Sequence, residues 1–124
     1  GDFYVRFNGD SGNNYYYGIA FMADNGAGAG SENGAAPNGC KLNRLTYIDD
    51  ADFGSGEIVI AINPRNSRQA TLHSEGFYSS GVLARGEASD GGCRYLGSAD
   101  ITSVTFGRTA GTFVGNVVLE RLLP

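Results

Sequence analysis

Residues 3–22 read FYVRFNGDSGNNYYYGIAFM, and the alternation within this stretch decides the fold class. Phe3, Val5 and Phe7 fall on one side of an extended chain, and the aromatic and branched residues between 15 and 21 alternate in the same way. Because successive side chains of a strand point to opposite faces, both runs predict half-buried β-strands. The NGDSGNN between them is a dense turn signal, so we expect a hairpin with a long loop.

The rest of the chain continues as short strands and turns. Segments rich in β-branched and aromatic residues predict further strands at 40–48, 57–62, 71–78, 82–87, 93–96, 101–106 and 116–122. Segments rich in Gly, Asn, Asp and Ser predict loops or turns at 24–39, 49–56 and 89–92. About eight or nine short strands without a credible helix predict an all-β, antiparallel β-sandwich that is jelly-roll-like.

Composition and charge narrow the function classes. The 124 residues fit one domain over residues 1–124, with 20 Gly, seven Tyr, seven Phe and no Trp. A net charge of −4 argues against a general nucleic-acid binder, whose affinity needs a basic face. No stretch approaches the ~20 apolar residues of a membrane span. The first strand begins almost at once, so we expect an open sheet edge there, which a preceding segment of the full protein or another subunit would cover.

The two cysteines leave two interpretations open. Cys40 and Cys93 are too far apart in the sequence for a paired metal spacing, and a single histidine is too few for a structural zinc site. A disulfide would suit an oxidising compartment, whereas two separate buried thiols would suit assembly in the cytosol. Both cysteines follow Gly-rich segments that can reach the same end of a sandwich. We therefore predict that their Cα atoms lie within bonding range, less than about 7 Å apart.

The loop after the first strand is a candidate calcium site. Asn8, Asp10 and Asn13 place side-chain oxygens close together, and calcium binds about six to eight oxygen atoms. The loop does not follow the EF-hand pattern and has only one carboxylate. Turn formation also accounts for Asn, Asp and Gly at these positions. Calcium, the only cofactor that the sequence suggests, is thus an alternative to a purely structural turn.

Exposed aromatic and acidic residues are the candidate binding groups. In a strand Tyr16 must face away from its neighbours, and an exposed ring can stack on a sugar or anchor a protein interface. Asp49 and Asp50 gather in an acidic turn, where paired carboxylates could bind calcium or a ligand or hydrolyse a glycoside, although acids in a polar turn are usually just solvated. His73 has no catalytic partner beside it, and neither a nucleophile elbow nor a phosphate loop occurs. We predict no catalytic residues and do not expect an enzyme.

Two segments at opposite ends of the chain carry a family resemblance. Residues 4–15, YVRFNGDSGNNY, are similar to a segment LRFNGDSGxNY, and residues 99–106 and 111–122 are similar to an ending aITSITl…gnFxxGsxfxLyGl. Both patterns belong to a family of phage virion domains described as tail, fibre or minor structural proteins. This chain departs from the pattern at Glu120-Arg121-Leu122, where an aromatic–Gly is usual. The resemblance implies a β-sandwich on the exterior of a phage particle, and it implies no catalytic residues.

Two function hypotheses follow. The first is a structural subunit of a virion or other extracellular assembly (decoration, fibre or tail) that associates with copies of itself or with other virion proteins. Apolar residues near the C-terminus, including Val117-Val118-Leu119, favour it, as does the scarcity of lysine, since Lys41 is the only one and edge lysines normally protect strands. The second is a carbohydrate- or receptor-binding module, favoured by the tyrosines and the polar loops.

Overall fold

The computed structural model describes residues 3–26, 28–36, 38–42, 53–80, 85–108, 116 and 118–121. Within these residues there are eight β-strands and no helix, which confirms the predicted all-β class. Among them, therefore, no helix is present that could cross a membrane. The strands are β1 (Phe3–Phe7), β2 (Tyr15–Ala23), β3 (Ala29–Ala36), β4 (Cys40–Lys41), β5 (Phe53–Ile62), β6 (Gln69–Ser80), β7 (Arg85–Leu96) and β8 (Val104–Arg108).

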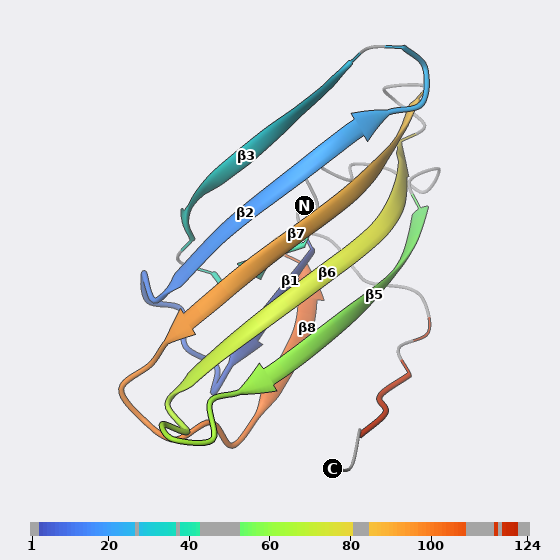
Figure 1. Cartoon of the computed structure of the whole chain (residues 1–124). Helices are drawn as coiled ribbons and strands as arrows, with labels where there is room; N and C mark the ends of the chain where they lie inside the picture. Colours follow the sequence, from blue (N-terminus) through green and yellow to red (C-terminus); the bar gives the residue numbers. More distant parts are fainter. Residues whose placement is uncertain are drawn as a thin grey trace.

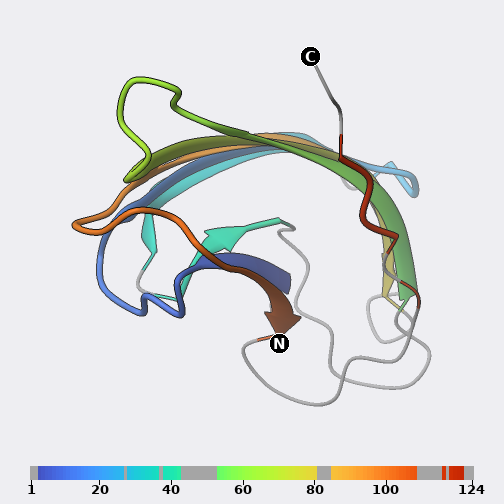
Figure 2. The same ribbon diagram turned by 90° about the horizontal axis from the view of Figure 1, so that it is seen from below.

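The strands form two antiparallel sheets that face each other (Figure 1). One has three strands in the order β4-β1-β8, and the other has five in the order β3-β2-β7-β6-β5. Figure 2 shows the larger sheet curving over the smaller one. The first strand pairs with the last and the second with the seventh, as in the nested pairing of a jelly roll, whereas β5, β6 and β7 follow one another as a meander.

The core lies between the sheets and is built on aromatic rings. Phe7, Tyr15 and Tyr95 are almost completely buried, and their ring centroids are 4.8 to 6.4 Å apart. Burial of one such side chain contributes roughly 1.5–3 kcal/mol. A disulfide joins Cys40 on β4 to Cys93 on β7, with 5.7 Å between the Cα atoms, so the bridge ties the small sheet to the large one.

The predicted hairpin of the first two strands is wrong, because β1 and β2 belong to different sheets. A two-stranded ribbon would leave the apolar faces of both strands without anything to cover them. In opposite sheets, the inward residues of β1 face those of β2, and the rings of Phe7 and Tyr15 stack.

The expected open edge at the first strand is also wrong. β1 is the central strand of its sheet, with Val5 opposite Cys40 on one side and Phe106 on the other. Its backbone groups are therefore paired within the chain, so β1 needs no other subunit to cover it.

Glycine-rich segments are strands in two places where the sequence predicts a loop or a turn. The predicted loop 24–39 contains β3, and the predicted turn 89–92 lies inside β7. A Cβ at Gly30 would lie 2.9 Å from the ring of Phe21, and one at Gly91 would lie 2.9 Å from a backbone oxygen. These glycines leave room for neighbouring atoms in the sheet, so they do not mark turns.

Two further boundaries differ from the sequence prediction. β5 begins at Phe53, inside the predicted turn 49–56, because its glycine and serine residues pair along β6 through their backbone. The predicted strand 116–122 is not formed at residues 116 and 118–121. Val118 and Leu119 are instead 81% and 91% exposed, so the alternation of apolar residues there has no partner strand in the described part of the chain.

Candidate functional site

The carboxylate of Asp10 organises the loop between β1 and β2. Its Oδ1 accepts a hydrogen bond from the Gly12 N–H (2.8 Å), and its Oδ2 accepts from Asn14 Nδ2 (2.8 Å) and from the Tyr95 hydroxyl (2.9 Å). The hydrogen bonds from Asn14 and then Gly12 lower the pKa of Asp10 from its ordinary 3.8. The loop is thereby fixed to β7, the neighbour of β2 in the large sheet, across the core from β1.

Asn8 joins the same loop to the chain before β8. Asn8 and Gly9 have φ of 54° and 68°, the left-handed region that Asn and Gly tolerate. The Asn8 Oδ1 accepts from the N–H groups of Thr102 (2.8 Å) and Ser103 (3.2 Å), and Nδ2 donates to the Asp100 carbonyl (2.9 Å). The two segments that carry the family resemblance are therefore in contact.

These contacts give two of the three calcium candidates, Asn8 and Asp10, a structural role in the loop. The oxygens of Asn8 and Asp10 already accept hydrogen bonds from protein donors, and Asn13 is exposed. No group of three His, Cys, Asp or Glu side chains suited to a metal occurs in the described part of the chain. The hydrogen bonds of Asn8 and Asp10 fit a structural turn, and calcium at Asn8, Asp10 and Asn13 stays a prediction.

Tyr15 and Tyr95 complete this buried network. The Tyr15 hydroxyl accepts from the Phe7 N–H (3.0 Å) and donates to the Asp10 carbonyl oxygen (2.9 Å). Burial raises the pKa of Tyr15, and burial together with the hydrogen bond to Asp10 raises the pKa of Tyr95 to about 12. Both tyrosines are thus neutral structural groups at ordinary pH.

Tyr16 lies on the outer face of the five-stranded sheet, as the alternation predicts. Its side chain is 39% exposed, and the guanidinium carbon of Arg94 lies 4.8 Å from the ring centroid. That distance is suitable for a cation–π contact that holds the ring in place. The other two binding candidates, Asp49 and Asp50, lie outside the described residues.

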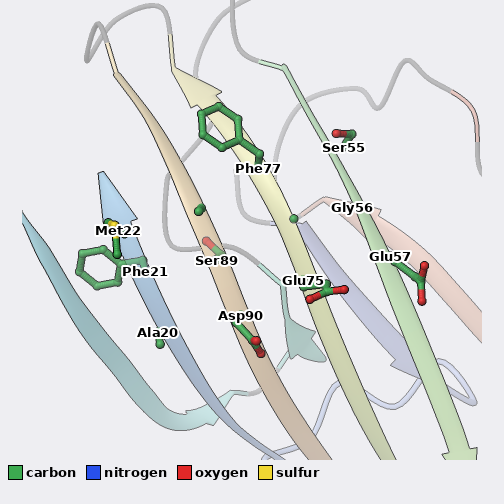
Figure 3. Close-up of a pocket in the computed structure, with 12 residues that line it drawn as sticks. Ala20, Phe21, Met22, Ser55, Gly56, Glu57, Glu75, Phe77, Ser89 and Asp90 are labelled. Atoms are coloured by element: carbon green, nitrogen blue, oxygen red, sulfur yellow. The ribbon is translucent and has the colours of Figure 1, made fainter. Parts of the chain in front are cut away.

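Two adjoining hollows lie on this outer face, with volumes of about 840 and 430 Å³. Figure 3 shows the larger one, with Glu75 and Asp90 on neighbouring strands and Met22 and Phe77 farther along. The Nε2 of His73 lies 2.8 Å from Asp90 Oδ1 at the smaller hollow. Alternation in the sequence places Tyr16 on this face, but the residues that line the hollows come from separate strands and share no sequence motif.

The two edges of the large sheet differ in chemistry. β3 consists of small and polar residues, whereas β5 ends in the apolar run Ile58–Ile62 and, among the described residues, is paired with β6 alone. Val59 and Ile62 are 44% and 45% exposed. The sequence predicts residues 57–62 as a strand but does not reveal that the strand is an edge.

Comparison with known proteins gives no relative. No protein-family model, curated protein or solved structure matches this chain. The resemblance to phage virion domains therefore rests on the sequence segments alone, and the function has to be inferred from the chemistry of the described surfaces.

Proposed function

We propose that this protein is a non-catalytic structural subunit that associates with copies of itself in an extracellular assembly, such as the decoration, fibre or tail parts of a phage particle. The observation that carries the proposal is the edge strand β5, which among the described residues pairs with β6 alone. It has 10 residues, and its last five, Ile58–Ile62, are all apolar. The phage context comes from the sequence resemblance, and the disulfide is compatible with an extracellular location.

Edge strands of soluble proteins are normally protected against pairing with other chains. Protection comes from lysine, proline, bulges or shortness. β5 has neither lysine nor proline, and Glu57 is its single charge. The chain's one lysine, Lys41, lies elsewhere, with Nζ 2.6 Å from Glu32 Oε1. A strand of this length and composition can pair with the strand of another chain through its backbone.

The chemistry of β5 suggests one register for two copies related by a two-fold axis. Opposite residues share a face, so the inward-facing Ile58, Ile60 and Ile62 must meet inward-facing residues of the second copy. With Ile60 opposite the partner's Ile60, Ile58 lies opposite the partner's Ile62, and Val59 lies opposite the partner's Ala61. The apolar run is then fully paired, and Glu57 does not meet its own counterpart, which would be repulsive.

Other apolar residues lie on the same side of the molecule. The C-terminal residues Val118 and Leu119 are almost fully exposed, and Figures 1 and 2 show their segment on the β5 side of the sandwich. Exposed apolar surface of this kind is typical of protein–protein contact. These residues would enlarge the contact beyond the paired strands.

Sedimentation velocity of the wild type and of two lysine variants tests this proposal. In the proposed register, Val59→Lys/Ala61→Lys places the lysine at 59 of each copy opposite the lysine at 61 of the other copy. Both positions are solvent-exposed in the single chain. The matched variant Ser31→Lys/Asn33→Lys adds the same charge to the outer face of β3.

We expect the wild type and the β3 variant to sediment as dimers or larger species, and the β5 variant to sediment as a folded monomer with an unchanged circular dichroism spectrum. A wild type that remains a monodisperse monomer, or a β5 variant that associates like the wild type, would contradict the proposal.

A further inference from the structure

Two glycines at the centre of the large sheet are not required by the fold itself. Gly18 on β2 lies opposite Gly92 on β7, in the interior of both strands. A Cβ at Gly18 would meet nothing within 4 Å, and one at Gly92 would meet only a backbone oxygen of Leu72 at an ordinary 3.6 Å. Neither has a positive φ. Glycine inside a strand costs about 0.5–1 kcal/mol relative to alanine, and nothing in the packing of the described residues offsets that cost.

The glycine pair is part of a longer strip without large side chains. On the same outward face, Ala20 follows Gly18 along β2, and Ala88 lies beyond Gly92 on β7. The strip runs from Tyr16 to Met22, a length of about 20 Å at the rise of a β-strand. The two hollows lie over the part of this strip from Gly18 to Met22, and Tyr16 lies just outside them; we call the whole strip the outer trough. Strand glycines that packing does not explain often mark the place where a ligand approaches the backbone closely.

The outer trough offers two exposed aromatic rings, Tyr16 at one end and Phe77 at the larger hollow, and several polar groups. Tyr16 is held at one end by Arg94, and its ring can receive the C–H face of a sugar. His73 and Asp90 form an exposed pair along the side, with Nε2 and Oδ1 2.8 Å apart and side chains 57% and 66% exposed. A carboxylate can accept a hydrogen bond from a sugar hydroxyl, and an imidazole can donate one to it or accept one from it.

The charges on this face favour a neutral ligand. Glu75 lies between Asp90 and Glu57, so one carboxylate stands on each of three adjacent strands. These groups would repel a phosphate or an acidic sugar. A second protein sheet packed flat on this face would take these carboxylates out of water, which is costly unless each of them meets a cationic partner. Sugar hydroxyls can donate hydrogen bonds to carboxylates that remain partly in water.

We propose that the outer trough binds a chain of neutral sugar residues, with Tyr16 stacking on one ring and His73 and Asp90 bonding to hydroxyl groups. This activity goes beyond the proposed self-association and uses another surface, because the trough lies on the face of the sheet and β5 is its edge. Sugar binding at the trough and self-association through β5 can therefore be tested independently.

Gly18→Val is the variant that tests the trough, because internal packing leaves room for the added side chain. Valine favours strands over glycine, so the melting temperature should not fall. The side chain would fill the floor of the trough, and binding should weaken by at least about tenfold, while Tyr16→Ala should weaken it by up to about tenfold. Ala29→Val adds a similar side chain to the outer face outside the hollows and should leave binding unchanged.

The binding assay uses a glycan array followed by titration calorimetry. The panel contains neutral oligosaccharides of glucose, mannose, galactose and N-acetylglucosamine, with oligogalacturonate as the acidic comparison. We expect binding of at least one neutral oligosaccharide and none of oligogalacturonate.

Three results would overturn the proposal. They are the absence of binding to any neutral oligosaccharide, equal binding of oligogalacturonate, and Gly18→Val binding as tightly as the wild type. If Gly18→Val reduces self-association and leaves sugar binding intact, the trough is an interface between copies and not a sugar site.

Discussion

Asp10→Ala should destabilise the protein by roughly 2–4 kcal/mol, because the carboxylate is the acceptor that joins the first loop to β7. Two of its hydrogen bonds, from Gly12 and Asn14, lie at the partly exposed side of the loop, where water can replace the lost acceptor. The third comes from Tyr95, a residue that is only 2% exposed. A buried hydroxyl left without an acceptor costs about 1–3 kcal/mol, so it accounts for much of the loss.

The assay is urea denaturation of Asp10→Ala, Tyr95→Phe and the double variant. The two substitutions should be coupled by about 1–2 kcal/mol, because each removes one partner of the same hydrogen bond. The lowered pKa of Asp10 means that the folded state favours the charged carboxylate. Its contribution is present above the ordinary value of 3.8 and is lost as the pH falls through the lowered value. A loss below about 0.5 kcal/mol for Asp10→Ala, or no coupling to Tyr95→Phe, would refute this reasoning.

Three further predictions concern the same framework. The pKa of Tyr95 is raised to about 12, and that of Tyr15 is also raised. Tyrosines of the unfolded chain ionise near pH 10, so the stability of the folded state should fall between about pH 10 and 12. Circular dichroism at stepped pH measures this loss, and unchanged stability over that range would contradict the prediction. Removing the disulfide by Cys40→Ala/Cys93→Ala should cost about 4 kcal/mol in urea denaturation, because the bridge spans 53 positions, and a loss near zero would count against the loop-entropy account. Asn8→Ala should cost more than Asn8→Gly, by about 1 kcal/mol, since only alanine adds strain at a φ of 54°, and equal losses in thermal unfolding would show that the strain is absent.

Alternation predicted the strands that have one apolar face and one polar face. Phe3, Val5 and Phe7 indicated β1, and the same pattern indicated β2 and the outward direction of Tyr16. Sheet membership was not predictable in the same way. Whether β1 lies beside β2 or across the core from it depends on contacts with strands that are distant in the sequence, such as β8.

Glycine was the main source of wrong boundaries. A glycine required by positive φ, such as Gly9, and one required by close packing, such as Gly30 beneath the ring of Phe21, look alike in the sequence. The first marks a turn and the second lies in the middle of a strand. Only the positions of neighbouring side chains separate the two cases, and those positions come from the three-dimensional fold.

The candidate site was likewise only partly predictable from the sequence. The sequence predicted a turn at Asn8 and Asp10, but their hydrogen bonds to Thr102 and Tyr95 join segments that are far apart in the chain. The outer trough is formed by single residues from several strands, so no continuous motif exists to find. Whether a strand is an edge is likewise a property of the whole sheet, which explains why β5 was identified as a strand but not as an open edge.

The pairing of β5 with β5 of a second copy is tested most directly by mixing two single-cysteine variants, Val59→Cys and Ala61→Cys. In the proposed register these positions lie opposite each other across the interface, and opposite Cα atoms in an antiparallel pair are about 4.5–5.5 Å apart, within the range of a disulfide. In either variant alone the introduced cysteines are diagonal neighbours about 7–8 Å apart, which disfavours a bond. The mixture should give a covalent dimer on a non-reducing gel, and each variant alone should give little. No covalent dimer in the mixture, or as much in each variant alone, would contradict the proposed assembly through β5.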